Sequence, residues 1–150
     1  MVKRIKDGRK VMMGQINTGT YGGNENKIQL FDGKFTTGYR IVSFRIAPQA
    51  PTGSYEILAK LSTETKSVIY QWDWGDVEEL AWAGWNISNS ATDLLHTNVR
   101  EENMAIEDLW ISSYTTGEAI IINYEIVLDK YEFTAWDGAA TLVRNQSQSG

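Results

Sequence analysis

The alternation of apolar and polar residues in "GSYEILAKLST" (residues 53–63) constrains the fold more than any other feature of the chain. The apolar members that share one parity are Tyr55, Ile57, Ala59 and Leu61. Polar residues, Lys60 among them, occupy the other parity, and Leu58 is the one exception. Because successive side chains of a strand point to opposite faces, this period of two predicts a half-buried antiparallel strand with Lys60 in solvent.

Three further segments have strand character. They are "YRIVSFRIAP" (39–48), "NMAIEDLWISSY" (103–114) and "EAIIINYEIVLDKYEF" (118–133). In the first, Val42, Phe44 and Ile46 fall on one face, and Pro48 ends the strand. The third is apolar at both parities over part of its length, which is typical of a central strand.

Turn signals separate these strands, and the Asp32-Gly33 pair suits a two-residue hairpin. The 150 residues fit one domain, and 13 glycines against 2 prolines favour strands joined by tight turns. Six to eight strands at this spacing predict an all-β, antiparallel two-sheet sandwich. We favour a jelly roll, with another Greek-key sandwich or a flattened barrel as alternatives.

The N-terminal segment differs from this pattern in charge and composition. Five basic residues and one acidic residue give the first ten positions a charge of +4 in a chain of net charge −5, so the remainder carries −9. The following "GQINTGTYGGNENK" is rich in Gly, Asn and Thr and has no strand or helix period. We therefore predict an extended basic arm over residues 1–27, a sandwich domain over 28–138 and a polar tail over 139–150.

Four of the six tryptophans fall within "WDWGDVEELAWAGW" (residues 72–85). The parity of "SVIYQWDW" (67–74) predicts that Trp72 and Trp74 end a strand and point into the core. Gly75 breaks the strand, and Asp76 suits the N-cap of one or two helical turns. The tryptophans at positions 82 and 85 then lie on one side of a short surface helix, where they cap the core of their own domain, which is the favoured interpretation, or contact a partner. A second helical turn is expected near Asp137.

The acidic residues of the same stretch are Asp73, Asp76, Glu78 and Glu79. Paired carboxylates hydrolyse glycosides only across a cleft, and the spacing does not follow the calcium-binding loop of helical hands. A solvated acidic turn is the favoured interpretation, ahead of a calcium site and of catalysis. His96 is the only histidine, and no Ser-containing elbow or phosphate-binding loop accompanies it. We expect no enzyme activity, cofactor or metal.

The segment "EDLWISSYTTGEAIIINYEIVLDKYEFTAWDGAATLVRNQSQ" (107–148) resembles the closing hairpin and tail of small jelly-roll virion proteins of bacterial viruses. The opening "GRKVMMGQINTGTYGGNENKIQLFDG" (8–33) resembles their extended N-terminal arm. The resemblance implies a capsid, cement or decoration subunit, located in the virion and assembled in the host cytoplasm. Its implied partners are other virion proteins and copies of itself. The resemblance assigns no catalytic residues to this chain.

A non-enzymatic structural subunit is thus the leading hypothesis, with the arm laid on a neighbouring subunit. Its candidate interface residues are Lys3, Arg4, Lys6, Arg9, Lys10, Tyr21, Trp82 and Trp85. The alternative is a carbohydrate-binding module whose Trp82 and Trp85 stack on sugar rings. The basic arm also predicts weak, salt-sensitive contact with nucleic acid. No apolar run approaches the roughly 18 residues of a membrane span, and we expect no membrane contact.

Overall fold

The computed structural model describes residues 3–19, 23–30, 33, 36–50, 55–66, 71–87, 94–100, 103–105 and 108–132. Side chains are described for all of these except residues 3–7, 55, 87 and 94–96. The strands are β1 (Lys3–Asn17), β2 (Asn24–Ile28), β3 (Thr37–Pro48), β4 (Tyr55–Ser62), β5 (Glu79–Ile87), β6 (Leu94–Val99), β7 (Leu109–Thr115) and β8 (Ile121–Glu132). Within the described ranges there is no helix, and hence none long and apolar enough to cross a membrane.

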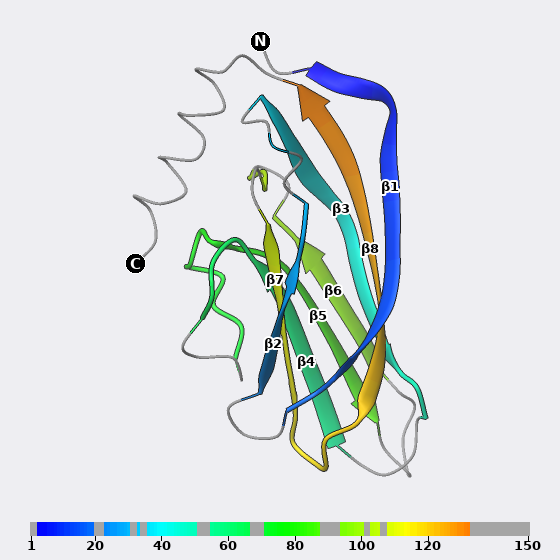
Figure 1. The fold of residues 1–150 in the computed structure, drawn as a ribbon. Coiled ribbons are helices and arrows are strands. Elements are labelled where there is room, and N and C mark those ends of the chain that lie inside the picture. Colours follow the sequence, from blue (N-terminus) through cyan, green and yellow to red (C-terminus); the bar gives the residue numbers. More distant parts are fainter. Residues whose placement is uncertain are drawn as a thin grey trace.

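The strands form two sheets that face one another (Figure 1). One has three strands in the order β1-β8-β3, and the other has five in the order β2-β7-β4-β5-β6. Every pairing between these strands is antiparallel. The prediction of an all-β, antiparallel two-sheet architecture is confirmed, as is the central position of β8.

Apolar side chains from both sheets meet in one core. Strand β4 contributes Ile57, Ala59 and Leu61, as its alternation predicted. The other sheet supplies Phe44 and Ile46 from β3, together with the inward residues of β8, which are Ile122, Ile126 and Leu128. Each of these side chains is almost fully buried, so burial of apolar area between the sheets is the main stabilising contribution.

Strand β3 departs from the alternation that its sequence suggests. Its pairing with β8 shifts register between Ile41 and Ser43, which marks a β-bulge. The extra residue shifts the alternation of inward and outward side chains by one position. As a result Ile41 is 1% exposed and joins the core, whereas Val42 is 37% exposed. The prediction that Val42 shares the face of Phe44 is therefore wrong.

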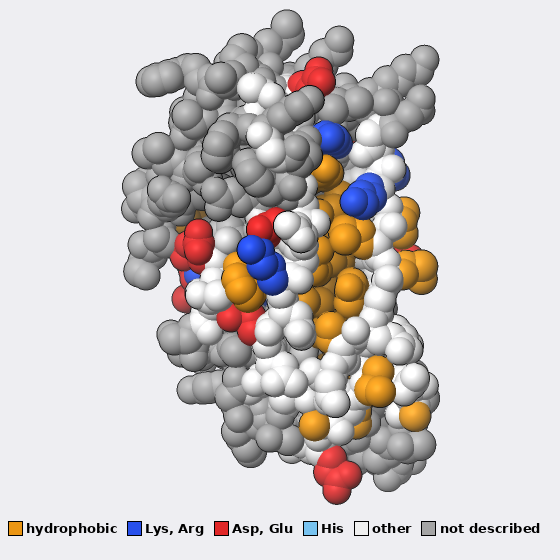
Figure 2. All heavy atoms as spheres, viewed as in Figure 1, with side chains coloured by type: hydrophobic (Ala, Val, Ile, Leu, Met, Phe, Trp, Pro, Cys, Tyr) orange, Lys and Arg blue, Asp and Glu red, His pale blue; other side chains and the backbone are white. Residues whose placement is uncertain are grey.

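The two sides of the sandwich differ. On one side β3 packs against β5 and β6. On the other side the edge strands are β1 and β2, and hydrophobic side chains gather in the strip between them (Figure 2). The partly buried Met12 and Ile16, which point inward from β1, pack against the core. The sandwich is thus closed along β3 and shows apolar surface along β1.

The N-terminal segment is part of the sandwich. Strand β1 pairs along its length with β8, with Val11 opposite Val127 and Asn17 opposite Ile121. Strand β2 pairs with β7 in the other sheet. The extended conformation of residues 3–17 was expected, but the structure places them on their own domain, where one edge of the strand pairs with β8 except at residues 5–8, around which the register shifts. The boundary drawn after residue 27 therefore does not separate an arm from the sandwich.

Residues 76–85 were expected to form one or two helical turns, but residues 79–87 form β5. Ala81, Ala83 and Trp85 occupy one parity and pack on the core, a period of two that the acidic residues before them obscured. Pairing with β4 on one side and β6 on the other stabilises the strand. Strand β6 itself lies in the mixed stretch "WNISNSATDLLHTNVREEN" (85–103), whose sequence predicts mostly loop. The expected turn near Asp137 and the tail 139–150 lie outside the described residues.

The bulge in β3 makes a testable prediction about stability. We expect Ile41→Ala to lower the free energy of unfolding by about 2–5 kcal/mol, because it opens a cavity in the core. Val42→Ala should change it by no more than about 0.5 kcal/mol, because the side chain is at the surface. Urea unfolding followed by tryptophan fluorescence measures both values. Equal losses, or a larger loss at Val42, would contradict the bulge.

Candidate binding site on the five-stranded sheet

The segment before β5, residues 71–78, covers part of the outer face of the five-stranded sheet. The indole N–H of Trp72 donates to the carbonyl oxygen of Ala59 in β4 at 3.1 Å. Its ring lies against Gly84 of β5, where a Cβ would come within 3.0 Å of the ring carbons. Glycine at position 84 therefore allows Trp72 to lie close to the strand.

A buried ion pair holds this segment to the sheet. Nζ of Lys60 lies 2.9 Å from Oε2 of Glu79, and both side chains are 2% exposed. Lys60 also donates to the carbonyl oxygen of Gln71 at 2.9 Å. The other carboxylate oxygen of Glu79 accepts hydrogen bonds from the backbone N–H of Asp73 at 2.9 Å and from the Trp82 indole at 2.8 Å.

The expected solvent exposure of Lys60 is thus wrong, although its parity was predicted correctly. It points away from the core between the sheets, but residues 71–78 cover it, and Glu79 of the neighbouring strand β5 supplies a carboxylate. A charged group removed from water requires such a partner, because the free-energy cost of its desolvation is otherwise not compensated.

Trp82 lies beneath this segment and is 3% exposed. The Arg100 guanidinium carbon lies 5.3 Å from its ring centroid. The same guanidinium donates to the backbone oxygens of Glu79 at 3.1 Å and Trp74 at 2.6 Å. Arg100 therefore fixes both the buried ring and the backbone that carries Trp74.

Trp74 is the exposed member of the cluster, with 56% of its surface accessible. Its ring centroid lies 5.6 Å from that of Trp82, at an interplanar angle of 51°. Together with Trp72 and with Thr97 and Asn98 of β6, these rings line a hollow of about 180 Å³. The described structure therefore places an aromatic hollow with a polar rim on the outer face of the sheet.

These positions correct the prediction that Trp72 and Trp74 end a strand and point into the core, whereas the favoured burial of Trp82 and Trp85 by their own domain agrees with the structure. Residues 71–74 are not part of a strand, and Trp74 is exposed instead of core-facing. Trp82 and Trp85 are three residues apart. Residues at this spacing lie on the same side of a helix but on opposite faces of a strand. Trp82 is buried under its own chain on the outer face, and Trp85 packs on the core. The two do not form one site.

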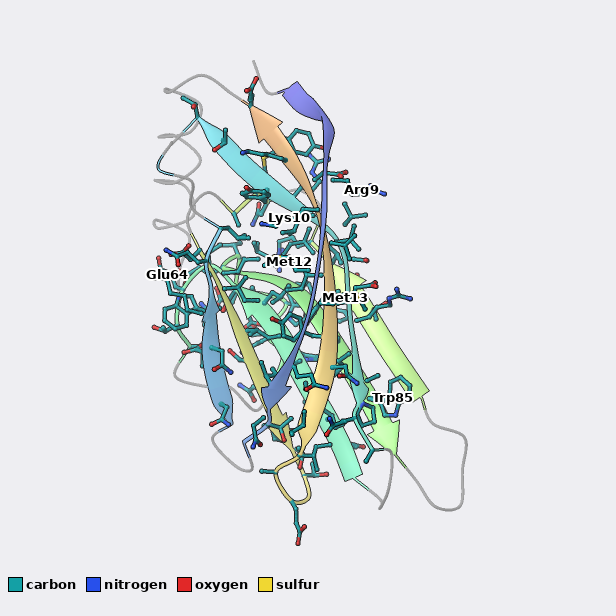
Figure 3. The ribbon with its side chains drawn as sticks, turned by 45° about the vertical axis from the view of Figure 1, so that its right-hand side comes forward. Arg9, Lys10, Met12, Met13, Glu64 and Trp85 are labelled. Carbon is teal, nitrogen blue, oxygen red and sulfur yellow. The ribbon has the colours of Figure 1, made fainter. Side chains whose placement is uncertain are left out.

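Trp85 borders a second hollow, of about 270 Å³, together with Met13, Ile46 and Tyr124. Met13 projects from β1 and Trp85 from β5 (Figure 3). The buried Nε1 of Trp85 has no hydrogen-bond partner among the described residues. Arg45 and Glu125 form an ion pair in the lining of this hollow. The two tryptophans predicted at an interface therefore border two different hollows.

The acidic residues act as internal acceptors, and the expected solvated turn is wrong for two of them because Glu78 and Glu79 are buried. Nζ of Lys66 lies 2.7 Å from both Asp76 and Glu78. Desolvation alone would raise the pKa of Asp76, but hydrogen bonds from Lys66 and from the Glu78 backbone outweigh it and lower that pKa. Desolvation likewise opposes the charge of Lys66, yet its two carboxylate partners raise its pKa. Among the described residues, no group of three or more His, Asp and Glu side chains is placed to hold a metal ion.

The predicted basic residues are dispersed along β1. Arg9 donates to both oxygens of Asp129, at 3.0 and 3.2 Å, and the pKa of Arg9 is raised by this hydrogen bonding and charge. Lys10 is exposed and extends to the opposite side of the strand (Figure 3). Lys3, Arg4 and Lys6 also belong to β1, without described side chains, and Tyr21 lies outside the described residues. His96 lies in β6, and its side chain is not described either.

Three residues of the cluster were missed from the sequence. Arg100, Thr97 and Asn98 reach the tryptophans only because β6 pairs with β5, with Asn98 opposite Trp82. No local pattern marks them, and only the register of β6 would have identified them. In comparisons with known proteins, no family model matches the chain and no curated protein is similar to it.

The buried ion pair makes a testable prediction about stability. We expect Lys60→Met to lower the free energy of unfolding by about 3–5 kcal/mol, because Glu79 is left buried without its cation. Lys27→Met is the matched control, since Lys27 pairs with Asp108 at 3.0 Å but is 52% exposed. Its loss should stay within about 1 kcal/mol. Similar losses in the two variants, measured by urea unfolding, would show that the pair at position 60 is not desolvated.

The Lys66 cluster predicts a dependence on pH. The lowered pKa of Asp76 gives stability that is present above about pH 4 and lost as pH falls through the folded-state pKa. The raised pKa of Lys66 gives stability that is present below about pH 10 and lost as pH rises through the folded-state pKa. The difference in unfolding free energy between the native protein and Lys66→Met should therefore be largest between these limits. A difference that does not vary from pH 3 to pH 11 would refute this assignment.

Proposed function

We propose that the chain is a non-enzymatic structural subunit of a virion, of the capsid or cement (decoration) type. In this proposal a jelly-roll sandwich assembles with copies of itself or with other virion proteins through strand β1. The subunit resides in the virion after assembly in the host cytoplasm. Three features support it: the order of strand pairing, the exposed surface of β1 and the distribution of charge.

The strand pairing supports a jelly roll. In that fold a long antiparallel ribbon rolls up, so the first strand lies beside the eighth, the second beside the seventh, the third near the sixth and the fourth beside the fifth. Here β1 pairs with β8, β2 with β7 and β4 with β5, and β3 contacts β6. Jelly rolls occur in viral capsid proteins, lectins and cupins. The fold class alone does not distinguish among these functions, so the function has to be inferred from the surface of the protein.

The exposed apolar surface of β1 is the observation that carries the proposal. Val11 is 54% exposed and Met13 is 74% exposed, both on the outward face of the strand. Among the described residues, β1 pairs only with β8, which leaves its other edge open. Soluble monomers usually protect long edge strands with charges, bulges or cover, and large exposed apolar groups mark interaction sites. The basic residues and the register shift of β1 lie within residues 3–10, so the part of the strand from Val11 onward lacks this protection. Strand β1 therefore suits a neighbouring subunit.

The apolar strip between β1 and β2 continues this surface (Figure 2). The resemblance to the N-terminal arms of virion proteins rests on residues 8–33, which include most of β1. In the proposed assembly this segment contacts the neighbour from its place in the sandwich.

Charge supports contact between protein subunits over contact with the genome. The first ten residues carry +4 and the remainder carries −9. The basic end of one copy is therefore attracted to the acidic body of another. Nucleic acid is attracted by the basic end but repelled by the rest of the molecule, so any such contact is weak and sensitive to salt.

The association of point variants tests this function. We expect the native protein to form oligomers or shells, and Met13→Lys to weaken association at least about tenfold, which corresponds to about 1.4 kcal/mol. Val42→Lys, on the other edge strand of the same sheet, is the matched control and should associate normally. Sedimentation velocity over a range of concentrations measures both. Substitutions are preferable to deleting residues 1–27, because deletion would remove two strands from the sandwich.

Closed shells in negative-stain electron microscopy would indicate a capsid subunit, and a discrete small oligomer would fit a cement subunit. A native protein that remains monomeric at every concentration would overturn the proposal. Equal weakening by Met13→Lys and Val42→Lys would overturn the assignment of the interface to β1.

A further inference from the structure

We propose that the hollow lined by Trp72, Trp74 and Trp82 binds a single neutral sugar ring. The proposal is independent of assembly through β1, because the hollow lies on the outer face of the other sheet. It replaces the Trp82 and Trp85 pair that the sequence suggested for sugar stacking. Exposure, rigidity, polar groups and charge each bear on it.

The exposed ring of Trp74 provides the stacking surface. An indole with more than half of its surface in water presents a large apolar area that its own fold does not use. One face of a pyranose carries C–H groups, which pack against aromatic rings, while the hydroxyl groups around its edge need hydrogen bonds. A flat ring bordered by polar groups matches both requirements.

The hollow is held rigid before any ligand binds. The indole N–H groups of Trp72 and Trp82 already donate to Ala59 and Glu79. Arg100 holds the backbone oxygen of Trp74 at 2.6 Å. Because these contacts fix the rings of Trp72 and Trp82 and the backbone of Trp74, binding has to order only the exposed Trp74 side chain, and this lowers its entropic cost.

Polar groups at the rim remain available to a ligand. The indole N–H of Trp74 has no partner among the described residues. Asn98 uses its side-chain oxygen to accept from the Val99 backbone at 3.0 Å, which leaves its amide hydrogens for a ligand. Thr97 is exposed beside it and adds a hydroxyl group. These groups offer donors and an acceptor of the kind that sugar hydroxyls need.

Size and charge favour a neutral ring over other ligands of aromatic sites. The volume of about 180 Å³ is below the roughly 300 Å³ at which pockets for drug-sized ligands begin, so it suits one ring. A quaternary ammonium group would bind the face of an aromatic ring, but the Arg100 cation already lies over Trp82. Nucleotide phosphates would meet the exposed Asp73, which lies between Trp72 and Trp74 in the chain.

Binding of free sugars to the full chain tests the proposal. The probes are methyl glycosides of glucose, galactose, mannose and N-acetylglucosamine, measured by saturation-transfer NMR and by tryptophan fluorescence. We expect at least one to bind and Trp74→Ala to weaken that binding at least tenfold. Because Trp74 is largely exposed, this variant should fold normally. Trp110→Ala is the matched control, since it removes a half-buried indole from β7 in the same sheet.

A second variant examines the polar rim. Thr97→Val keeps the shape of the side chain and removes its hydroxyl, so we expect a loss of affinity of about three- to tenfold with unchanged stability. Choline and a nucleoside monophosphate are measured alongside the sugars. Binding of either one without any sugar, or no binding by any probe, would overturn the proposal. So would equal losses in Trp74→Ala and Trp110→Ala.

The two proposals can fail separately. Trp74→Ala should leave association through β1 unchanged, and Met13→Lys should leave sugar binding unchanged. If the protein binds sugars but remains a monomer, the sugar-binding proposal stands and the structural role is overturned. If it forms oligomers but binds no sugar, the structural role stands and the sugar-binding proposal is overturned.

Discussion

The organisation of the five-stranded sheet depends on the ion pair between Lys60 and Glu79. This pair lies on the outer face of the sheet, yet both side chains are 2% exposed because residues 71–78 cover them. The pair joins β4 to β5, and the same two side chains bond the carbonyl oxygen of Gln71 and the backbone N–H of Asp73, which holds the covering segment in one position. The hydrogen bond from Trp82 to Glu79 extends the same constraint to the tryptophan cluster.

This constraint gives the two sheets different outer surfaces. The five-stranded sheet carries a rigid aromatic hollow, whereas the three-stranded sheet exposes aliphatic side chains on its edge strand β1. Because the two surfaces lie on different sheets, a neighbouring subunit can occupy β1 while a ligand occupies the hollow. A structural subunit that also contacts a sugar-bearing surface is therefore compatible with the fold.

Much of the fold was predictable where a strand has one buried face and an uninterrupted period. Strand β4 shows this, because Ile57, Ala59 and Leu61 all reach the core. In β3 the bulge at Val42 depends on pairing with β8, and no local preference marks it. The sequence of β5 predicts a helix because its acidic start resembles a helix N-terminus. The same stretch shows the candidate site only as a cluster of tryptophans, and its parity gives the wrong orientation for Trp72 and Trp74.

The sequence by itself determined the all-β class, the two-sheet architecture and the inward residues of β4, because local alternation fixes which side chains share a face. Only the tertiary structure decided that residues 3–17 join the sandwich, that Lys60 is buried and that Trp74 is exposed. Each of these depends on contacts between segments distant in sequence: β1 with β8, Lys60 with Glu79, and Arg100 with the backbone of Trp74. A local pattern predicts which side chains of a strand share a face, but not which distant part of the chain covers that face.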